Sequence, residues 1–152
     1  MPFTMQASSV SGSCFCKMSY FSFFRGSESI INCHCKACRG VSGATFSTWV
    51  SVNRTRVLHL PTDHLNAIRF KESLVRYSCA MCSSHIYTID QKHPETIGFP
   101  LGAITSGLDD AAVQAHYCVD EKAPWHTISD NIPQVTSCAD FDPLPFATSS
   151  SN

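Results

Sequence analysis

Short segments in which aromatic and β-branched residues partly alternate with polar residues dominate the chain. Such segments are typical of strands, and clusters of Gly, Pro, Asn, Asp and Ser separate them as turns. Long stretches with apolar residues at helical spacing do not occur. In chain order, the predicted strands are residues 17–24, 45–52, 74–79, 85–90, 96–104 and 115–120. The pattern therefore predicts a mainly-β protein built from small antiparallel sheets.

Helical structure is expected only in short turns, at residues 36–41 and 109–113, where Asp109 and Asp110 would cap the second turn. Residues 1–11 and 138–152 have the character of flexible tails. A chain of 152 residues is long enough to bury a core in one domain without disulfides to stabilise it. We expect that domain to span residues 12–137.

Composition and charge narrow the function classes. The formal net charge is −1 and the Lys and Arg residues are scattered, whereas a nucleic-acid-binding protein usually gathers them in a basic patch. No run of about 18 apolar residues predicts a membrane span. The first ten residues, MPFTMQASSV, lack the basic start and apolar middle of a secretory signal. We therefore expect a cytoplasmic protein without nucleic-acid or membrane partners.

Nine cysteines in a reducing compartment call for an explanation other than disulfides. Seven of them form three tight groups: Cys14 and Cys16; Cys33, Cys35 and Cys38; Cys79 and Cys82. Two cysteines in a C-x-C pattern do not readily bridge each other, but a tight turn can direct both sulfurs at one zinc ion. Cys118 and Cys138 stand apart, and Cys118 is expected to be a buried small apolar residue.

The three groups can be assigned to two zinc ions per chain. A structural zinc takes two thiolates from each of two distant turns, which Cys14, Cys16, Cys79 and Cys82 can supply. The remaining trio, Cys33, Cys35 and Cys38, offers three ligands and an open position, which is typical of a catalytic zinc. Alternatively, a fourth side chain closes the trio; the candidates are His34, His85, His116, His126 and Cys118.

Three thiolates around Zn²⁺ leave a formal charge of −1, which suits the binding of a substrate thiol or the weak polarisation of a carbonyl oxygen. Arg39 follows the trio directly, and it would offset this charge, pair with a substrate carboxylate or form a surface salt bridge. Addition of a thiol to a carbonyl also needs a general acid. The histidine candidates are His34, His116 and His126.

Five segments occur in an order that resembles a known family: GSCFCKMSY, CHCKACRGVSGATFSTWV, RYSCAMCSSHI, GLDD and KAPWHTISDNIPQ. Between residues 12 and 134 the chain is similar to the glutathione-dependent formaldehyde-activating enzymes, whose relatives include centromere protein V. The resemblance implies a β-tent fold, a structural zinc and a catalytic zinc on the cysteine sets given above. It also implies a carbon–sulfur lyase that makes or breaks S-hydroxymethylglutathione.

The chain departs from the family pattern beside the expected structural zinc. Lys17 stands where the family usually has glycine, and the sequence SSHI at residues 83–86 replaces a segment such as Gly-Ser-Pro-Leu. Because glycine often serves a left-handed turn, these changes predict reshaped turns around the metal within a retained fold. His85, in place of a proline, is expected to be exposed.

Three functions are consistent with these features. The first is a zinc-dependent carbon–sulfur lyase or thiol-adduct enzyme that acts on glutathione and a small aldehyde. The second is a zinc Lewis-acid enzyme that isomerises, cyclises, decarboxylates or eliminates from a larger carbonyl compound of specialised metabolism. The third is a zinc-stabilised interaction module without catalysis, which the near-neutral charge and the absence of a long basic or Pro-rich tail argue against.

Overall fold

The computed structural model describes residues 8–70 and 73–138, and it confirms the mainly-β class. A four-stranded sheet has the order β10 (Ile104–Ser106), β1 (Ser9–Ser13), β2 (Tyr20–Phe24), β5 (Val57–His59). The larger sheet has the order β12 (Gln134–Val135), β11 (Ala115–Tyr117), β3 (Ser29–Cys33), β4 (Ser47–Asn53), β9 (Thr96–Pro100), β8 (His85–Asp90), β7 (Leu74–Cys79), β6 (Leu65–Phe70). Within the described residues, the helical elements are α1 (Lys36–Ser42) and three 3₁₀ turns, η1 (Arg54–Arg56), η2 (Leu101–Ala103) and η3 (Val119–Glu121).

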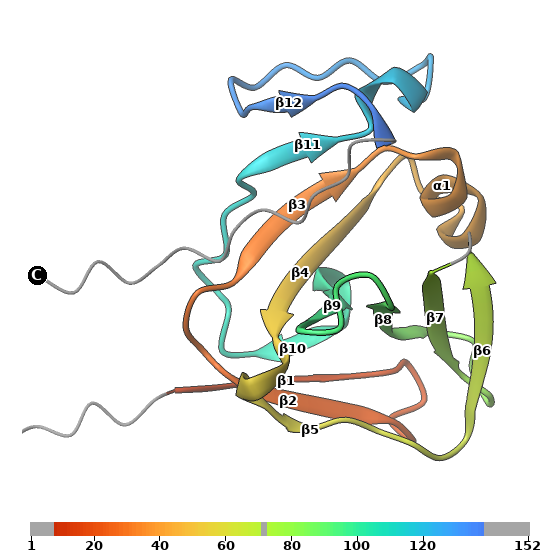
Figure 1. The fold of residues 1–152 in the computed structure, drawn as a ribbon, viewed down its shortest axis with the longest axis vertical. Coiled ribbons are helices and arrows are strands. Elements are labelled where there is room, and N and C mark those ends of the chain that lie inside the picture. Colours follow the sequence, from red (N-terminus) through yellow and green to blue (C-terminus); the bar gives the residue numbers. More distant parts are fainter. Residues whose placement is uncertain (1–7, 71–72, 139–152) are drawn as a thin grey trace, which may run out of the picture.

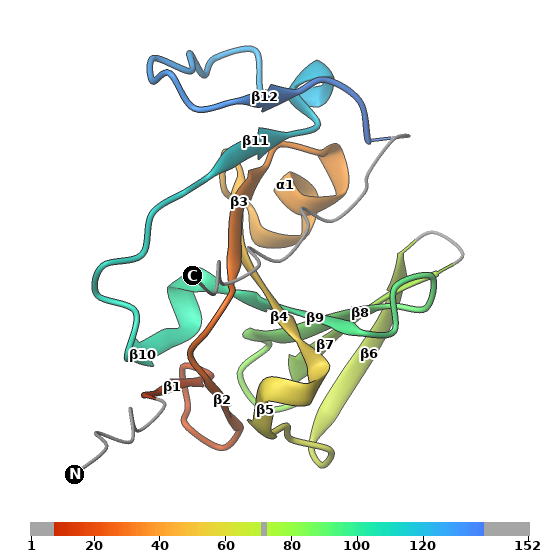
Figure 2. The ribbon, with the colours of Figure 1, turned by 60° about the vertical axis from the view of Figure 1, so that its left-hand side comes forward.

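The larger sheet bends so that its two halves face each other. In Figure 1 the four-stranded sheet lies at the base, β3 and β4 rise obliquely on one side, and β6 and β7 stand on the other. The helix α1 lies near the top of the space between them, and β11 and β12 extend the sheet beyond β3 (Figure 2). Most strand pairs are antiparallel, but β11 runs parallel to both β3 and β12, a mixed arrangement that the sequence pattern did not predict.

The core joins the two sheets through aromatic stacking. Phe21 and Phe23 of β2 stack on Phe99 of β9, with ring centroids 4.4 and 5.3 Å apart. Their alternation along β2 places both rings on the buried face of the small sheet, and Val50 and Val52 of β4 fill the same cluster. Burial of several large apolar side chains at about 1.5–3 kcal/mol each makes this cluster the main apolar contribution to stability.

Several predicted elements are correct, and others needed tertiary information. β7 and β8 have the predicted bounds, and the turn at residues 36–41 is α1. The segment 96–104 divides at η2 into β9 and the start of β10, so that it serves both sheets. The strands β1, β3, β5, β6 and β12 were not predicted. β5 has three residues and β12 has two, which are too few to show a pattern, and β3 is buried at every position and does not alternate.

The helical turn predicted at residues 109–113 is wrong. Ala111 donates a single backbone hydrogen bond to Leu108 at 3.0 Å, and the segment continues as loop. The Asp110 carboxylate forms an ion pair with Arg25 at 2.6 Å instead of capping a helix, and this interaction lowers the pKa of Asp110.

The tails also differ from expectation at their inner ends. β1 begins at Ser9, inside the segment expected to be a tail, because it pairs with both β2 and β10. Cys138 is part of a disulfide described below. Residues 1–7 and 139–152 lie outside the described parts of the chain.

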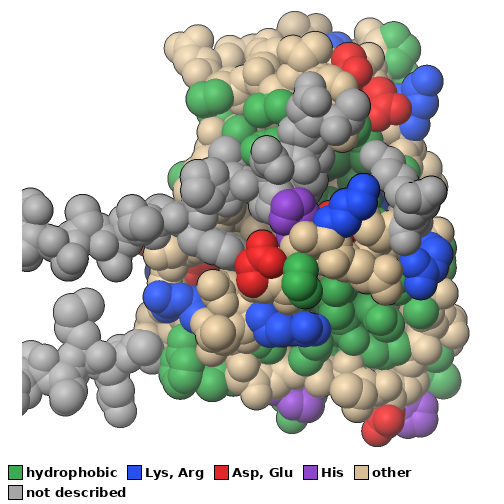
Figure 3. Space-filling model, in the orientation of Figure 1, with side chains coloured by type: hydrophobic (Ala, Val, Ile, Leu, Met, Phe, Trp, Pro, Cys, Tyr) green, Lys and Arg blue, Asp and Glu red, His purple; other side chains and the backbone are tan. Residues whose placement is uncertain are grey.

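Basic and acidic side chains are interspersed over the face shown in Figure 3. Within residues 8–70 and 73–138, no helix has the length and apolar character needed to cross a membrane.

Gly107 allows β10 to approach β1, and this contact gives a first test of the fold. Its φ is 97°, and an added Cβ would lie 2.5 Å from the carbonyl oxygen of Ser9. Gly107→Ala should therefore lower the free energy of unfolding by about 1–3 kcal/mol. Gly102→Ala is the matched control, because no atom lies within 4 Å of its added Cβ. Equal effects of the two substitutions in chemical denaturation would contradict the packing of β10 on β1.

Candidate metal centres and pocket

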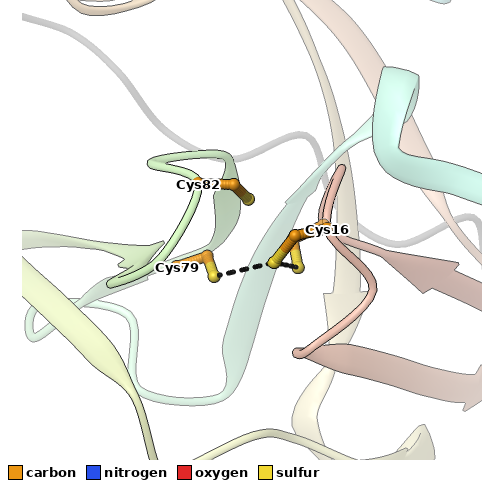
Figure 4. A group of neighbouring side chains, drawn as sticks. Cys16, Cys79 and Cys82 are labelled. Carbon is orange, nitrogen blue, oxygen red and sulfur yellow. Dashed lines mark hydrogen bonds between the residues drawn. The ribbon is translucent and has the colours of Figure 1, made fainter.

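Four cysteine sulfurs from the two sheets converge in one group. Cys14 and Cys16 belong to the turn after β1, Cys79 ends β7, and Cys82 lies in the turn that follows (Figure 4). All four sulfurs lie within 4.8 Å of one another, with Cys14–Cys16 at 3.5 Å and Cys16–Cys79 at 3.7 Å. Zinc–sulfur bonds of about 2.3 Å in a tetrahedron require sulfurs about 3.8 Å apart. The spacing therefore fits a four-thiolate zinc.

The turns around this group keep the left-handed conformation without glycine. Lys17 and Ser83 both have φ of 65°, and their backbone N–H groups donate to the carbonyl oxygens of Cys14 and Cys79. Ser84 links the two turns, since its hydroxyl accepts from the Phe15 N–H at 3.1 Å and lies 3.1 Å from the Cys82 sulfur. The departures from the family sequence thus leave the left-handed turns in place.

A second group consists of the predicted trio. Cys33 ends β3, Cys35 caps the N-terminus of α1 with its sulfur accepting from the Cys38 N–H at 3.2 Å, and Cys38 lies in the first turn. Gly43, with φ of 72°, ends this short helix. The three buried sulfurs lie within 4.8 Å of one another. Among the described residues, no further Cys, His, Asp or Glu side chain joins this group at that spacing.

The trio is chemically suited to binding a cation. The pKa of Cys35 is lowered, mainly because the Cys33 and Cys38 thiols donate hydrogen bonds to its sulfur. The same sharing raises the pKa of Cys33, with burial adding to the effect. One thiolate therefore forms readily, and a bound metal would replace the remaining protons, as metal binding to thiols generally does. Three closely spaced soft sulfurs fit zinc.

Arg76 of β7 places a positive charge beside the trio, which is one of the three roles that the sequence suggested for Arg39. Its side chain is 6% exposed, its Nη2 donates to the Cys38 sulfur at 2.8 Å, and its guanidinium lies 5.0 Å from the ring centroid of Trp49. A buried guanidinium is costly unless an anionic group compensates it. A thiolate form of the trio would supply one such anionic group, and the contact with Cys38 places the guanidinium against it.

The trio lies on the wall of a cavity of about 360 Å³ between the two halves of the larger sheet. Ile31, Trp49 and Leu74 give this pocket an apolar wall, and Asp90 and Lys92, near the β8–β9 turn, add charged groups. The pocket thus combines a sulfur cluster, an apolar surface and separated polar groups, which is the usual composition of a small-molecule site.

The three predicted histidines do not line this pocket. His34 is 0% exposed, its Nε2 is 2.9 Å from Nδ1 of His116, and Nε2 of His116 is 3.1 Å from both carboxylate oxygens of Asp130. Burial, followed by the nearby positive charges, lowers the pKa of His34 to about 4. His126 stacks on His34 at 5.8 Å. These residues form a chain that connects the trio's loop to the C-terminal segment.

Arg39 and His85 also differ from their predicted places. Arg39 donates to the carbonyl oxygen of Glu121 at 2.9 Å and lies 5.8 Å from the ring of Trp125, away from the lining of the pocket. His85 is half-buried rather than exposed, because it begins β8 and stacks on Trp49 at 6.2 Å. Arg76 could have been noticed in the sequence as a charged residue inside the otherwise apolar strand LVRYSC.

Cys118 and Cys138 form a disulfide, which corrects the prediction that Cys118 is a free apolar residue. The parallel strands β11 and β12 place the two cysteines side by side, a contact between residues 20 positions apart that spacing alone does not reveal. Both residues lie on the lining of the pocket.

Comparison with protein families matches residues 9–121 to the family described as glutathione-dependent formaldehyde-activating enzyme. The chain belongs to this family. A crystal structure of a Rhodobacter sphaeroides protein shares the fold, with a TM-score of 0.51 and 17% sequence identity over 68% of this chain and 96% of that one. Comparison with curated proteins gives no significant match. Membership supports a glutathione-related, metal-binding function for the two cysteine groups.

The two cysteine groups should respond differently to loss of one ligand. Cys79→Ser removes a ligand that joins the two sheets, and because binding energy at a structural zinc is largely folding energy, we expect poorly soluble protein. Cys35→Ser should remain folded and retain one zinc ion. Metal analysis and circular dichroism measure both outcomes, and equal loss of folding in the two variants would contradict separate roles.

Arg76 should strengthen metal binding at the trio. Arg76→Gln leaves the trio without its guanidinium contact. The affinity of the trio for zinc should therefore fall about tenfold, so that a chelator removes the metal more readily. Arg39→Gln is the matched control, because Arg39 contacts Glu121 and Trp125 rather than a trio sulfur. Competition with a chromogenic chelator measures the difference. Equal retention in both variants would show that Arg76 does not support the metal.

Proposed function

We propose that this protein is a zinc-dependent carbon–sulfur lyase or thiol-adduct enzyme that joins or separates a thiol of the glutathione type and a small aldehyde. The observation that carries the proposal is the trio on the pocket wall, which the described residues leave without a fourth protein ligand. Zinc held by Cys33, Cys35 and Cys38 would supply Lewis acidity at this wall. The other cysteine group would hold the structural zinc.

The reaction needs limited chemistry from the protein. The thiol sulfur forms a bond to the carbonyl carbon, the thiol proton is lost and the carbonyl oxygen gains a proton; lysis is the reverse. Arg76 compensates the negative charge of the trio, so that an anionic sulfur is less strongly repelled there. Trp49 packs against Arg76 and gives this end of the pocket an apolar surface.

The polar groups of the pocket are suited to a zwitterionic thiol. Glutathione carries carboxylates and an ammonium group, and Lys92 and Asp90 offer the complementary charges. His93 lies on the same lining, and an imidazole is the usual side chain for proton transfer near neutral pH. We propose His93 as the proton donor or acceptor in place of the three buried or displaced histidines.

A second candidate is a zinc Lewis-acid enzyme that acts on a larger carbonyl compound. The observation that favours it is the apolar wall of Ile31, Trp49 and Leu74 in a cavity of about 360 Å³. Such a volume can enclose a ligand much larger than formaldehyde. In this case the thiol would be dispensable, and the substrate would contact the apolar wall.

Exchange NMR spectroscopy on glutathione and formaldehyde tests the first candidate directly. The zinc-loaded protein should accelerate formation and breakdown of the adduct, and Cys35→Ser, as a folded variant without the trio's metal, should not. Lys92→Ala should raise the glutathione concentration needed for half-maximal rate by about tenfold. No acceleration by the zinc-loaded protein would exclude the lyase. Thermal stabilisation by carbonyl compounds without a thiol would then favour the second candidate.

A further inference from the structure

The Cys118–Cys138 disulfide is a sulfur pair that neither metal group uses. Both cysteines line the same pocket as the trio, and Cys118 packs in one apolar cluster with Cys33, Cys35 and Cys38. A molecule in the pocket therefore has access to two kinds of sulfur: the trio and a disulfide. A disulfide crosslinks the chain wherever it forms. The surroundings of this one decide whether it can also react with a molecule in the pocket.

The backbone holds the two cysteines together independently of the bridge. β12 pairs with β11 through His116 with Gln134 and Tyr117 with Val135, and these pairs end one residue before Cys118 and three residues before Cys138. The Asp120 N–H also donates to the carbonyl oxygen of Thr136 at 3.0 Å. Opening the bridge would thus leave the two thiols close to each other, so the pair can close again without refolding of the chain.

The two sulfurs of the bridge differ in their exposure and surroundings. Cys118 is 2% exposed, whereas Cys138 is partly exposed. The Glu121 carboxylate oxygen lies 3.2 Å from the Cys138 sulfur, where it can accept the proton of a Cys138 thiol. Access decides which sulfur of a disulfide is attacked, so Cys138 is the sulfur that an incoming thiolate reaches.

We propose that the Cys118–Cys138 pair is a thiol–disulfide exchange site for a small-molecule thiol that enters the pocket. The thiolate attacks the Cys138 sulfur, the bond to Cys118 breaks, and Cys118 leaves as a thiolate that takes up a proton. A second thiolate attacks the small molecule's sulfur in this mixed disulfide, the small-molecule disulfide is released, and Cys138 leaves as a thiolate that takes up a proton. The bridge gains two electrons and two thiols lose them. This activity goes beyond the lyase reaction and does not depend on it.

Single-cysteine variants of the zinc-loaded protein test the asymmetry. With Cys118→Ser, glutathione disulfide should modify Cys138 and the adduct should persist, because the thiol that would expel it is missing. With Cys138→Ser, the buried Cys118 should be modified about tenfold more slowly or less. Intact mass measurement with peptide mapping identifies the modified residue. Modification of Cys118 at an equal or faster rate, or none in either variant, would overturn the proposal.

The unmodified protein provides a test that does not depend on how the variants fold. In mixtures of glutathione and its disulfide, the ratio of open to closed bridge should follow the square of the glutathione concentration, since opening consumes two thiols. A thiol attached to a large polymer should open the bridge about tenfold more slowly than glutathione, because it cannot enter the pocket. A bridge that stays closed at every ratio, or equal rates for the two thiols, would refute the site.

Discussion

Convergence of four thiols between the two sheets is the constraint on which the other features depend. Cys14 and Cys16 come from the turn of the small sheet, and Cys79 and Cys82 come from the turn between β7 and β8 of the large one. Together with the aromatic stack around Phe99, this group joins the two sheets. A metal there would fix β7 relative to β1 and β2.

Fixing β7 also determines the chemistry at the opposite end of the molecule. Cys79 and Arg76 lie three residues apart on β7, so they point to opposite faces of the strand. One face supplies a ligand to the four-sulfur group, and the other places the guanidinium against Cys38. The bend of the large sheet brings β7 opposite β3 and α1 (Figure 1). The strand that the four-sulfur group holds in place is therefore also the strand that supplies the positive charge beside the trio.

Local sequence information was sufficient to predict which cysteines group together, but it was insufficient to predict the strands and side chains that surround them. The spacings C-x-C and C-x₂-C determine which sulfurs a single turn can bring together, so both cysteine sets could be assigned from the sequence. The strands β7 and β8 were predictable because aromatic and β-branched residues run through them. β3 was missed although it carries the first ligand of the trio, because its residues SIINC are buried at every position and do not alternate.

Contacts between distant strands explain which side chains surround the trio. In the extended segment Cys33–His34–Cys35, neighbouring side chains point to opposite sides, so two sulfurs face the pocket and the imidazole faces His116. Proximity in the sequence therefore made His34 and Arg39 the candidates for side chains beside the trio. In the folded chain, Arg76, 38 residues beyond Cys38, donates a hydrogen bond to the Cys38 sulfur. The Cys118–Cys138 bridge has the same origin, since the parallel pairing of β11 and β12 creates it. The side chains that contact the loop of the trio come from the strands that face it. The order of strands in the sheet determines which residues these are, and a local sequence motif does not show that order.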